Sequence, residues 1–208
     1  TACRLCGKCA LFCPVDAISI CGREVTVDEI FSEIVKDKTF YESSGGGVTF
    51  SGGECMLHPD VIAELCEKCR SAGINTAIDT AGCVPWASFE KVVGLADLFL
   101  YDIKCVTPEL SREFIGVGNS LILDTYKKLL ERGCEVIVRV PMIVECSAND
   151  AEFSKIAEFL RSNRPAKVEL LPYHALGENK FRALGRGEPR RFTAPAEEAL
   201  AGYRELVK

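Results

Sequence analysis

Apolar residues recur along this chain in two alternating patterns. One has helical spacing, as at Ile30, Phe31 and Ile34, where the apolar positions fall on one face of a helix. The other is a short, nearly continuous apolar run, as in strands that are covered on both faces. The two patterns alternate from residue 48 onward. This alternation predicts an α/β fold with parallel strands, because parallel neighbours need a crossover that a helix supplies.

Five segments have the composition of strands. They are 48–50, 74–79, 98–104, 135–140 and 168–171. No glycine-rich phosphate-binding fingerprint follows the first of them, which favours a partial (β/α) barrel over a doubly wound sheet. Periodicity alone does not separate these two arrangements.

Capping residues mark the expected helix boundaries. We expect helices over 26–36, 59–73, 119–132, 149–161 and 195–207. Thr26 and Glu29 have the spacing of a capping box, in which each side chain satisfies a free backbone donor of the other residue. Asn149 and Glu152 have the same spacing at a later helix.

Composition and charge narrow the class of protein. Hydrophobic residues make up 48% of the chain and charged residues 26%, which is typical of a folded globular protein. A net charge of -5 argues against nucleic acid or an anionic membrane as a partner. No apolar run approaches the roughly 20 residues that span a bilayer. We therefore expect a cytoplasmic protein with no membrane contact.

The cysteines change this picture, because the chain has 12 of them. Four crowd the N-terminus in the pattern Cys3-x2-Cys6-x2-Cys9-x3-Cys13-Pro14, which is the bacterial ferredoxin spacing and predicts a [4Fe-4S] cluster. Zinc is the alternative, but zinc sites more often pair two cysteines with a distant second pair. A uniform disulfide framework does not fit such an uneven distribution.

The fourth ligand of this cluster is left open. In two-cluster ferredoxins the cysteine before proline binds the other cluster, so Cys13 implies a second cysteine run that this sequence lacks. Cys21 is an alternative ligand, although its apolar surroundings suit a small buried residue. We expect residues 1–25 to form an iron–sulfur segment and residues 26–208 the barrel. The chain opens at Thr1, inside the motif, which suggests a piece of a longer protein.

Polar residues follow the expected strands, where (β/α) barrels carry their chemistry. They are Ser51-Gly52-Gly53-Glu54, Asp79-Thr80, Asp102 with Lys104, Arg139, and His174. Glycines allow a ligand to approach the backbone, and Glu54 can accept from an ammonium group. Asp102 and Lys104 lie on one side of their strand because a single residue separates them.

Each of these residues also has a purely structural interpretation. The glycine pair can be a turn, Asp102 and Lys104 a surface ion pair, and His174 an ordinary histidine. Arg139 stands in apolar text, where a charge must be paired. Polar groups at five consecutive strand ends together favour a site. The scattered cysteines are expected to be small buried residues without metal, and they are Cys55, Cys66, Cys69, Cys83, Cys105, Cys134 and Cys146.

Several of these motifs occur together, in order, in one known family. They are residues 45–54, 79–82, 101–104, 139–141 and 170–177. With them the chain resembles the radical S-adenosylmethionine (SAM) enzymes that activate glycyl radical enzymes, the family of pyruvate formate-lyase activase. The resemblance implies a partial (β/α) barrel of radical SAM type lacking its first strand. It also implies that residues 1–25 are a remnant of the ferredoxin-like [4Fe-4S] insert found in one subgroup.

The resemblance further implies cofactors, partners and roles. The implied SAM-binding residues are Gly52, Gly53, Glu54, Asp79, Asp102, Lys104, Arg139 and His174. Among them Gly53 and Glu54 would hold the amino group of SAM, and Asp79 and Lys104 its amino and carboxylate ends. Arg139 and His174 would hold the rest of the molecule. The family is anaerobic and takes electrons from a donor such as flavodoxin or ferredoxin. Its members reductively cleave SAM and remove hydrogen from a glycine of a partner, here a dehydratase, decarboxylase or C–N lyase.

The chain departs from the family pattern in ways that leave other functions open. The Cys-x3-Cys-x2-Cys loop that binds the catalytic cluster is absent, so we expect no activity from this chain alone. Cys55 replaces a common proline, and Val144-Glu145-Cys146 replaces a common Pro-Gly turn. One alternative is a non-catalytic iron–sulfur module for electron transfer or docking. Another is a Schiff-base aldolase-like barrel that uses Lys104 as its nucleophile.

Overall fold

The computed structural model is an α/β fold built on one sheet of five parallel strands, as the sequence predicted. It describes residues 4, 6–20, 22–177, 184 and 190–207. The strands are β1 (Gly47–Phe50), β2 (Asn75–Thr80), β3 (Leu98–Asp102), β4 (Val136–Met142) and β5 (Lys167–Pro172). They pair in the order β1-β2-β3-β4-β5, so each strand lies beside its neighbour in the sequence. This order and the parallel pairing are those of an open barrel segment.

Helices precede, separate and follow the strands. They are α1 (Lys8–Leu11), α2 (Val27–Lys36), α3 (Lys38–Ser44), α4 (Pro59–Ser71), α5 (Trp86–Glu90), α6 (Pro108–Phe114), α7 (Ser120–Glu131), α8 (Asp150–Ser162) and α10 (Glu197–Leu206), with 3₁₀ turns at Cys55–Leu57 and Ala175–Gly177. The five predicted helices are confirmed to within two residues at each end. The short helices α3, α5 and α6 were not predicted, because one or two turns are too short to show a clear helical spacing of apolar residues.

Capping explains where α2 and α8 begin. The Glu29 N–H donates to Thr26 Oγ1 at 3.2 Å and the Thr26 N–H donates to Glu29 Oε2 at 2.7 Å, which completes the predicted capping box. At α8 the Glu152 N–H donates to Asn149 Oδ1 at 3.0 Å, but the Glu152 carboxylate does not return to Asn149. It accepts instead from the Val106 N–H at 2.6 Å, so it joins α8 to the loop after β3.

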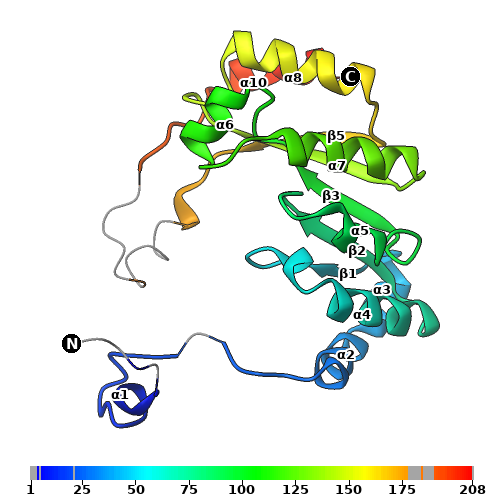
Figure 1. Cartoon of the computed structure of the whole chain (residues 1–208), viewed down its shortest axis with the longest axis vertical. Helices are drawn as coiled ribbons and strands as arrows, with labels where there is room; N and C mark the ends of the chain where they lie inside the picture. Colours follow the sequence, from blue (N-terminus) through cyan, green and yellow to red (C-terminus); the bar gives the residue numbers. More distant parts are fainter. Residues whose placement is uncertain (1–3, 5, 21, 178–183, 185–189, 208) are drawn as a thin grey trace.

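The two faces of the sheet differ. Ile78, Tyr101 and Val138 are fully buried on the face that the helices cover, and α4, α5 and α7 lie along that side in Figure 1. Alternate residues point to the opposite, open face. On that face the strand register pairs Asp102 with Arg139. The alternation of strand residues therefore separates a buried apolar core from a half-exposed face, which carries apolar residues such as Leu100 and Ile137 as well as the charged residues Asp102 and Arg139.

The N-terminal segment has no core of its own. α1 is one turn without a buried residue, and Leu11, Phe12 and Val15 are 80%, 76% and 76% exposed. Figure 1 shows this segment projecting from the sheet, with an extended stretch leading to α2. No helix among the described residues is long and apolar enough to cross a membrane.

Candidate functional site

Five side chains from four consecutive strands form one bonded group, which we call the strand-end cluster. Arg139 was expected at the end of its strand, but it lies in the middle of β4 because that strand continues to Met142. Its members are Ser51, Asp79, Asp102, Lys104 and Arg139. Ser51 Oγ donates to Asp79 at 2.8 Å, and the Arg139 guanidinium donates to Asp79. Arg139 also donates to Asp102, through Nε at 3.2 Å and Nη2 at 3.1 Å. Lys104 Nζ completes the group 3.3 Å from Asp102.

The strand-end cluster is balanced in charge and only partly hydrated. The side chains of Arg139, Asp79 and Asp102 are 18%, 22% and 21% exposed, and that of Lys104 is 34% exposed. Charge-assisted hydrogen bonds are strong in such surroundings. Two carboxylates and two cations side by side suit a zwitterion, because an ammonium finds carboxylates and a carboxylate finds cations. An amino-acid head group has this chemistry.

The glycine pair beside the cluster leaves room for a ligand. Gly52 has φ 125°, in the region that favours glycine, and a Cβ added at Gly52 or Gly53 would meet no atom within 4 Å. The backbone of this loop therefore faces open space. A ligand held by the strand-end cluster can approach its carbonyl and N–H groups.

Glu54 holds this loop in place. Its Oε1 accepts from Thr80 Oγ1 at 2.8 Å and from the Met56 N–H at 3.1 Å, and its Oε2 accepts from the Ala81 N–H at 3.0 Å. The bonds from Thr80 and Ala81 attach the glycine loop to the end of β2, and the bond from Met56 caps the 3₁₀ turn that follows the loop. The role of Glu54 as an ammonium ligand stays a prediction, and its positioning role is an addition that spacing alone did not suggest.

Position 82 has no room for a side chain, because a neighbouring tyrosine fills the space. Its φ is 70°, and a Cβ there would lie 1.7 Å from the Tyr101 hydroxyl oxygen. That hydroxyl donates to the Ile122 carbonyl at 2.6 Å, and burial raises the pKa of Tyr101 above its usual value. The turn after β2 is therefore set by a buried, protonated tyrosine that admits only glycine.

His174 and Cys55 take different positions at the rim. His174 follows β5 and is exposed, and within the described part of the chain it makes no hydrogen bond to the strand-end cluster. Cys55 is buried and donates to the Phe50 carbonyl at 3.4 Å and the Asp79 carbonyl at 3.5 Å. Burial, with the Glu54 and Asp79 charges, raises the pKa of Cys55 to about 12. A neutral thiol therefore stands where proline is common, and no charged group is lost.

The N-terminal cysteines are described only in part, since Cys3 and Cys21 lie outside the described residues. Cys6 and Cys9 are exposed and Cys13 is half-buried. The Cys13 pKa is lowered by backbone N–H groups, chiefly that of Val15 and then that of Ala17, whose nitrogen is 3.2 Å from the sulfur. These donors favour the thiolate that iron requires. In the described residues no three His, Cys, Asp or Glu side chains gather around one metal position, so the cluster stays a prediction.

Most of the scattered cysteines are buried, as expected of small apolar residues. The buried ones are Cys55, Cys66, Cys69, Cys105 and Cys146, whereas Cys134 is half-buried and Cys83 is exposed.

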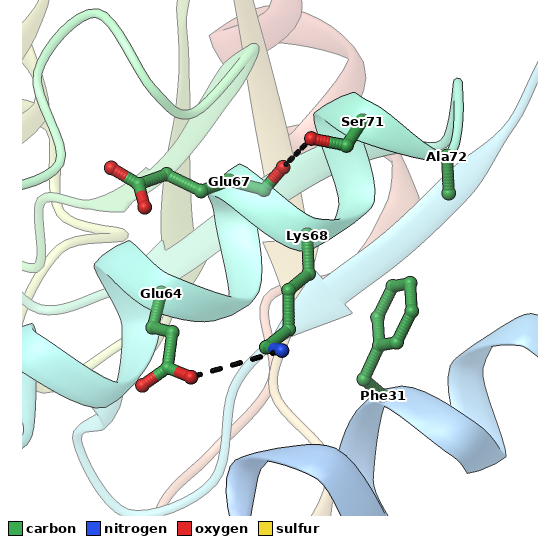
Figure 2. Close-up of a pocket in the computed structure, with 6 residues that line it drawn as sticks. All are labelled: Phe31, Glu64, Glu67, Lys68, Ser71 and Ala72. Atoms are coloured by element: carbon green, nitrogen blue, oxygen red, sulfur yellow. Dashed lines mark hydrogen bonds and ion pairs between the residues drawn. The ribbon is translucent and has the colours of Figure 1, made fainter.

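A second, shallow pocket lies between α2 and α4 (Figure 2). Its one cation, Lys68, is 3.9 Å from Glu64 and 2.9 Å from Asp28, and its ammonium lies 5.9 Å from the centre of the Phe31 ring. Ser71 Oγ donates to the Glu67 carbonyl at 2.9 Å. These groups satisfy one another, so we assign the pocket no ligand.

The family model described as "Radical SAM superfamily" matches residues 4–160. The chain belongs to the radical SAM superfamily. The assignment of residues in the strand-end cluster to SAM stays a prediction.

Similar proteins within the superfamily are activating enzymes. The chain is 40% identical over 197 residues to the trans-4-hydroxy-L-proline dehydratase activating enzyme of Clostridioides difficile, covering 93% of this chain and 65% of the relative. It is 30% identical over 210 residues to the pyruvate formate-lyase 2-activating enzyme of Escherichia coli K12, covering 99% and 72%. The chain therefore spans about two thirds of the length of these relatives.

Solved structures agree on the radical SAM fold. A domain of the pyruvate-formate lyase-activating enzyme from Bacteroides vulgatus superposes with a TM-score of 0.66 at 29% identity, covering 78% of this chain and 92% of that domain. Streptococcus suis SuiB bound to S-adenosylmethionine gives 0.63 at 16% identity, covering 88% and 40%, which supports the fold alone. The predicted partial barrel is confirmed by these neighbours.

Proposed function

We propose that this chain is the SAM-binding barrel, with an accessory iron–sulfur segment, of an enzyme that generates a glycyl radical on a partner enzyme. One observation carries the proposal: Asp79, Arg139, Asp102 and Lys104 are joined across β2, β3 and β4, beside the open Gly52-Gly53 backbone. The relatives support it, since their names describe activators of dehydratases, decarboxylases and lyases. A cytoplasmic location and a dehydratase, decarboxylase or C–N lyase as partner belong to the same proposal.

The amino-acid end of SAM fits the charges of the strand-end cluster. Its ammonium would bind Asp79 and the Gly53 carbonyl, and its carboxylate would bind Lys104 and Arg139. Asp102 holds both cations in position, and His174 is available for the remainder of the molecule. When bound beside a reduced [4Fe-4S] cluster, SAM supplies the radical that removes hydrogen from a glycine. The residues of this chain orient it and neutralise its charges.

The N-terminal segment would serve electron transfer. Cys3, Cys6, Cys9 and Cys13 have the spacing of ligands to a [4Fe-4S] cluster, and a flavodoxin or ferredoxin would be its donor. The 208 residues contain no Cys-x3-Cys-x2-Cys sequence, the motif that would bind the catalytic cluster. Binding of SAM, rather than turnover, is therefore the property to test in this chain.

Calorimetry with SAM tests the assignment of Lys104. Lys104→Ala should weaken binding by about 1.5 to 3 kcal/mol, roughly tenfold or more, because an ammonium facing a carboxylate is lost from a partly dry site. Lys91→Ala is the matched control, since Lys91 forms an exposed ion pair with Asp60 at 2.6 Å elsewhere. If Lys104→Ala binds SAM as well as the parent chain does, the assignment is wrong. Borohydride trapping of a carbonyl substrate on Lys104 would instead support the aldolase alternative.

A further inference from the structure

Glu152 is a buried carboxylate that the proposed function does not use. It stands in the first turn of α8 and is 2% exposed. Its Oε1 accepts from the Val106 N–H at 2.6 Å and from the Thr107 N–H at 2.9 Å, and its Oε2 accepts from the Thr107 hydroxyl. That hydroxyl also accepts from Lys155 Nζ at 2.9 Å. A buried charge is retained where several donors point at it, so the carboxylate and this two-residue segment hold each other in place.

The segment that Glu152 binds comes directly after Lys104 and its neighbour in the chain. β3 ends at Asp102, and its register with β4 also ends there. The sheet holds the chain as far as Ile103, whose N–H donates to the Arg139 carbonyl at 3.0 Å. Lys104 lies beyond that bond, so strand register alone does not fix its position as it fixes those of Asp102 and Arg139.

After Lys104 the chain is held at three consecutive residues. Asn119 Nδ2 donates to the Cys105 carbonyl at 3.2 Å, and Glu152 binds the next two N–H groups. α8 gives this contact a rigid base, because the neighbouring Phe153 is fully buried in the core. Lys104 is therefore held between the sheet on one side and α8 on the other.

We propose that Glu152 is a positioning residue, which fixes the chain after β3 so that the Lys104 ammonium lies beside Asp102 and faces the carboxylate of SAM. This inference rests on the proposed function, which assigns Lys104 to that carboxylate. Lys104 Nζ lies 3.3 Å from Asp102, and its side chain is 34% exposed. A lysine on a free loop would lose much conformational freedom on binding. A lysine that α8 already holds in place loses less, so it binds a carboxylate more tightly.

Three substitutions at Glu152 separate this role from a general loss of stability. Glu152→Met keeps the length of the side chain but leaves the Val106 and Thr107 N–H groups without an acceptor. Glu152→Gln is the conservative variant, because its single carbonyl oxygen can replace Oε1, which accepts from both N–H groups. Glu152→Asp keeps the charge but is one methylene shorter, and it takes the place of Glu152→Met if that variant does not fold.

Asp97 offers a matched control at the other end of the strands. Its Oδ2 accepts from the Thr76 N–H at 2.7 Å and from the Thr76 hydroxyl at 3.0 Å, as Glu152 accepts from the same two groups of Thr107. Asp97 directly precedes β3, whereas the strand-end cluster lies toward the opposite ends of the strands. Asp97→Leu should lower stability as Glu152→Met does, without moving Lys104.

Acetylation of lysines measures the position of Lys104 without SAM. Folded parent and variants are treated with a limiting amount of an acetylating ester, and modification is quantified by peptide mass mapping. Lys104 should react about threefold faster in Glu152→Met, because the exposed fraction of its side chain can rise from 34% to nearly full exposure. Lys91, whose ion pair with Asp60 is exposed, is the internal reference.

The controls decide how this acetylation rate is interpreted. Lys104 should react in Glu152→Gln and in Asp97→Leu at the same rate as in the parent. An unchanged rate at Lys104 in the folded Glu152→Met or Glu152→Asp variant would overturn the proposal. An equal increase in Asp97→Leu would overturn it as well, because general loosening of the fold would then explain the change.

A double-mutant cycle with Lys104→Ala tests the link to SAM by calorimetry. Glu152→Met should weaken SAM binding roughly threefold to tenfold in the parent background and should have no effect in the Lys104→Ala background, because it acts only through Lys104. Equal weakening in both backgrounds would overturn the proposal. If the parent chain binds no SAM, the proposed function fails, and the acetylation result alone decides whether Glu152 positions Lys104.

Discussion

The strand-end cluster and the N-terminal cysteine segment are organised in opposite ways. In the cluster, Arg139 lies between two carboxylates on adjacent strands, and each of these side chains is about one-fifth exposed. In the N-terminal segment, Cys6 and Cys9 are exposed, and α1 buries no residue. One group is arranged by the sheet before any ligand binds, whereas the other has donors of the right type without a scaffold.

The two regions differ in what fixes their geometry, which is packing of the sheet in one and binding of a metal cluster in the other. Packing of the sheet fixes the strand-end cluster, so its geometry should survive without SAM. A structural metal site commonly takes its shape only when the metal binds, and the binding energy is then folding energy. The N-terminal segment should therefore become ordered with its iron–sulfur cluster. A substitution that prevents cluster uptake should leave the sheet folded, and one that destabilises the sheet should leave cluster uptake unchanged.

The largest effect is expected from the cysteines. Replacing both Cys6 and Cys9 by Ser should abolish cluster uptake and leave unfolding of the sheet unchanged, because α1 contributes nothing to the core. Iron and sulfide analysis after anaerobic reconstitution measures the first result, and urea unfolding the second. Cys83→Ser is the control, since Cys83 is an exposed thiol outside the run. Uptake of zinc without sulfide by the parent would contradict the iron–sulfur prediction.

A substitution in the apolar core should instead destabilise the sheet without acting on the N-terminal segment. Phe153 is fully buried and its ring centre is 4.5 Å from that of Tyr203, so Phe153→Ala should cost about 3 to 5 kcal/mol of unfolding free energy. Cluster uptake should be unaffected. Phe40, which is 71% exposed, gives the control, and Phe40→Ala should cost less than about 0.5 kcal/mol. Loss of the cluster in folded Phe153→Ala protein would show that the two regions are coupled.

An intermediate effect is expected within the strand-end cluster. Arg139→Ala leaves Asp79 and Asp102 without their shared cation in a partly buried site, and should cost about 2 to 3 kcal/mol in denaturant unfolding. Arg139→Lys should recover part of this loss. The exposed ion pair of Arg112 and Glu109, at 3.5 Å, is the comparison, and Arg112→Ala should cost less than about 0.5 kcal/mol. Equal costs at both arginines would mean that the cluster is not preorganised.

The smallest effect concerns the junction between the two regions. The pKa of Glu29 is lowered by hydrogen bonds from the backbone and then the side chain of Thr26. Because the folded pKa lies below the unfolded one, the capping box stabilises α2 above the unfolded value of 4.5, and this contribution is lost as pH falls through the folded pKa. Glu29→Gln should be less stable than the parent near neutral pH, and the gap in the urea midpoint should shrink in acid. A pH-independent gap would assign the difference to packing.

Sequence patterns predicted correctly those features that depend on residues close together in the chain. The Thr26 and Glu29 capping box and the five strands follow from spacing and apolar runs. Glu152 shows the limit, because its capping spacing suggested a local partner while its carboxylate binds the loop after β3. Such a contact depends on where two distant segments meet, which no local pattern encodes.

In the functional site, too, some features could be predicted from the sequence and others could not. Polar residues at strand ends could be identified from the sequence, and Arg139 had to be paired because it stands among apolar residues. Its partners, Asp79 and Asp102, are set by register between strands. Ser51 stood in the right motif without an assigned role, and its bond to Asp79 required the neighbouring strand.

The contact between Gly82 and Tyr101 restricts how this family member can evolve. Position 82 is closed to side chains for two separate reasons, its φ of 70° and the tyrosine hydroxyl 1.7 Å from any Cβ. A smaller residue at position 101 removes only the second reason, and also gives up the hydroxyl bond to Ile122. No single compensating change therefore opens the position, and in a library of random variants glycine should remain fixed at 82 even where Tyr101 has been replaced.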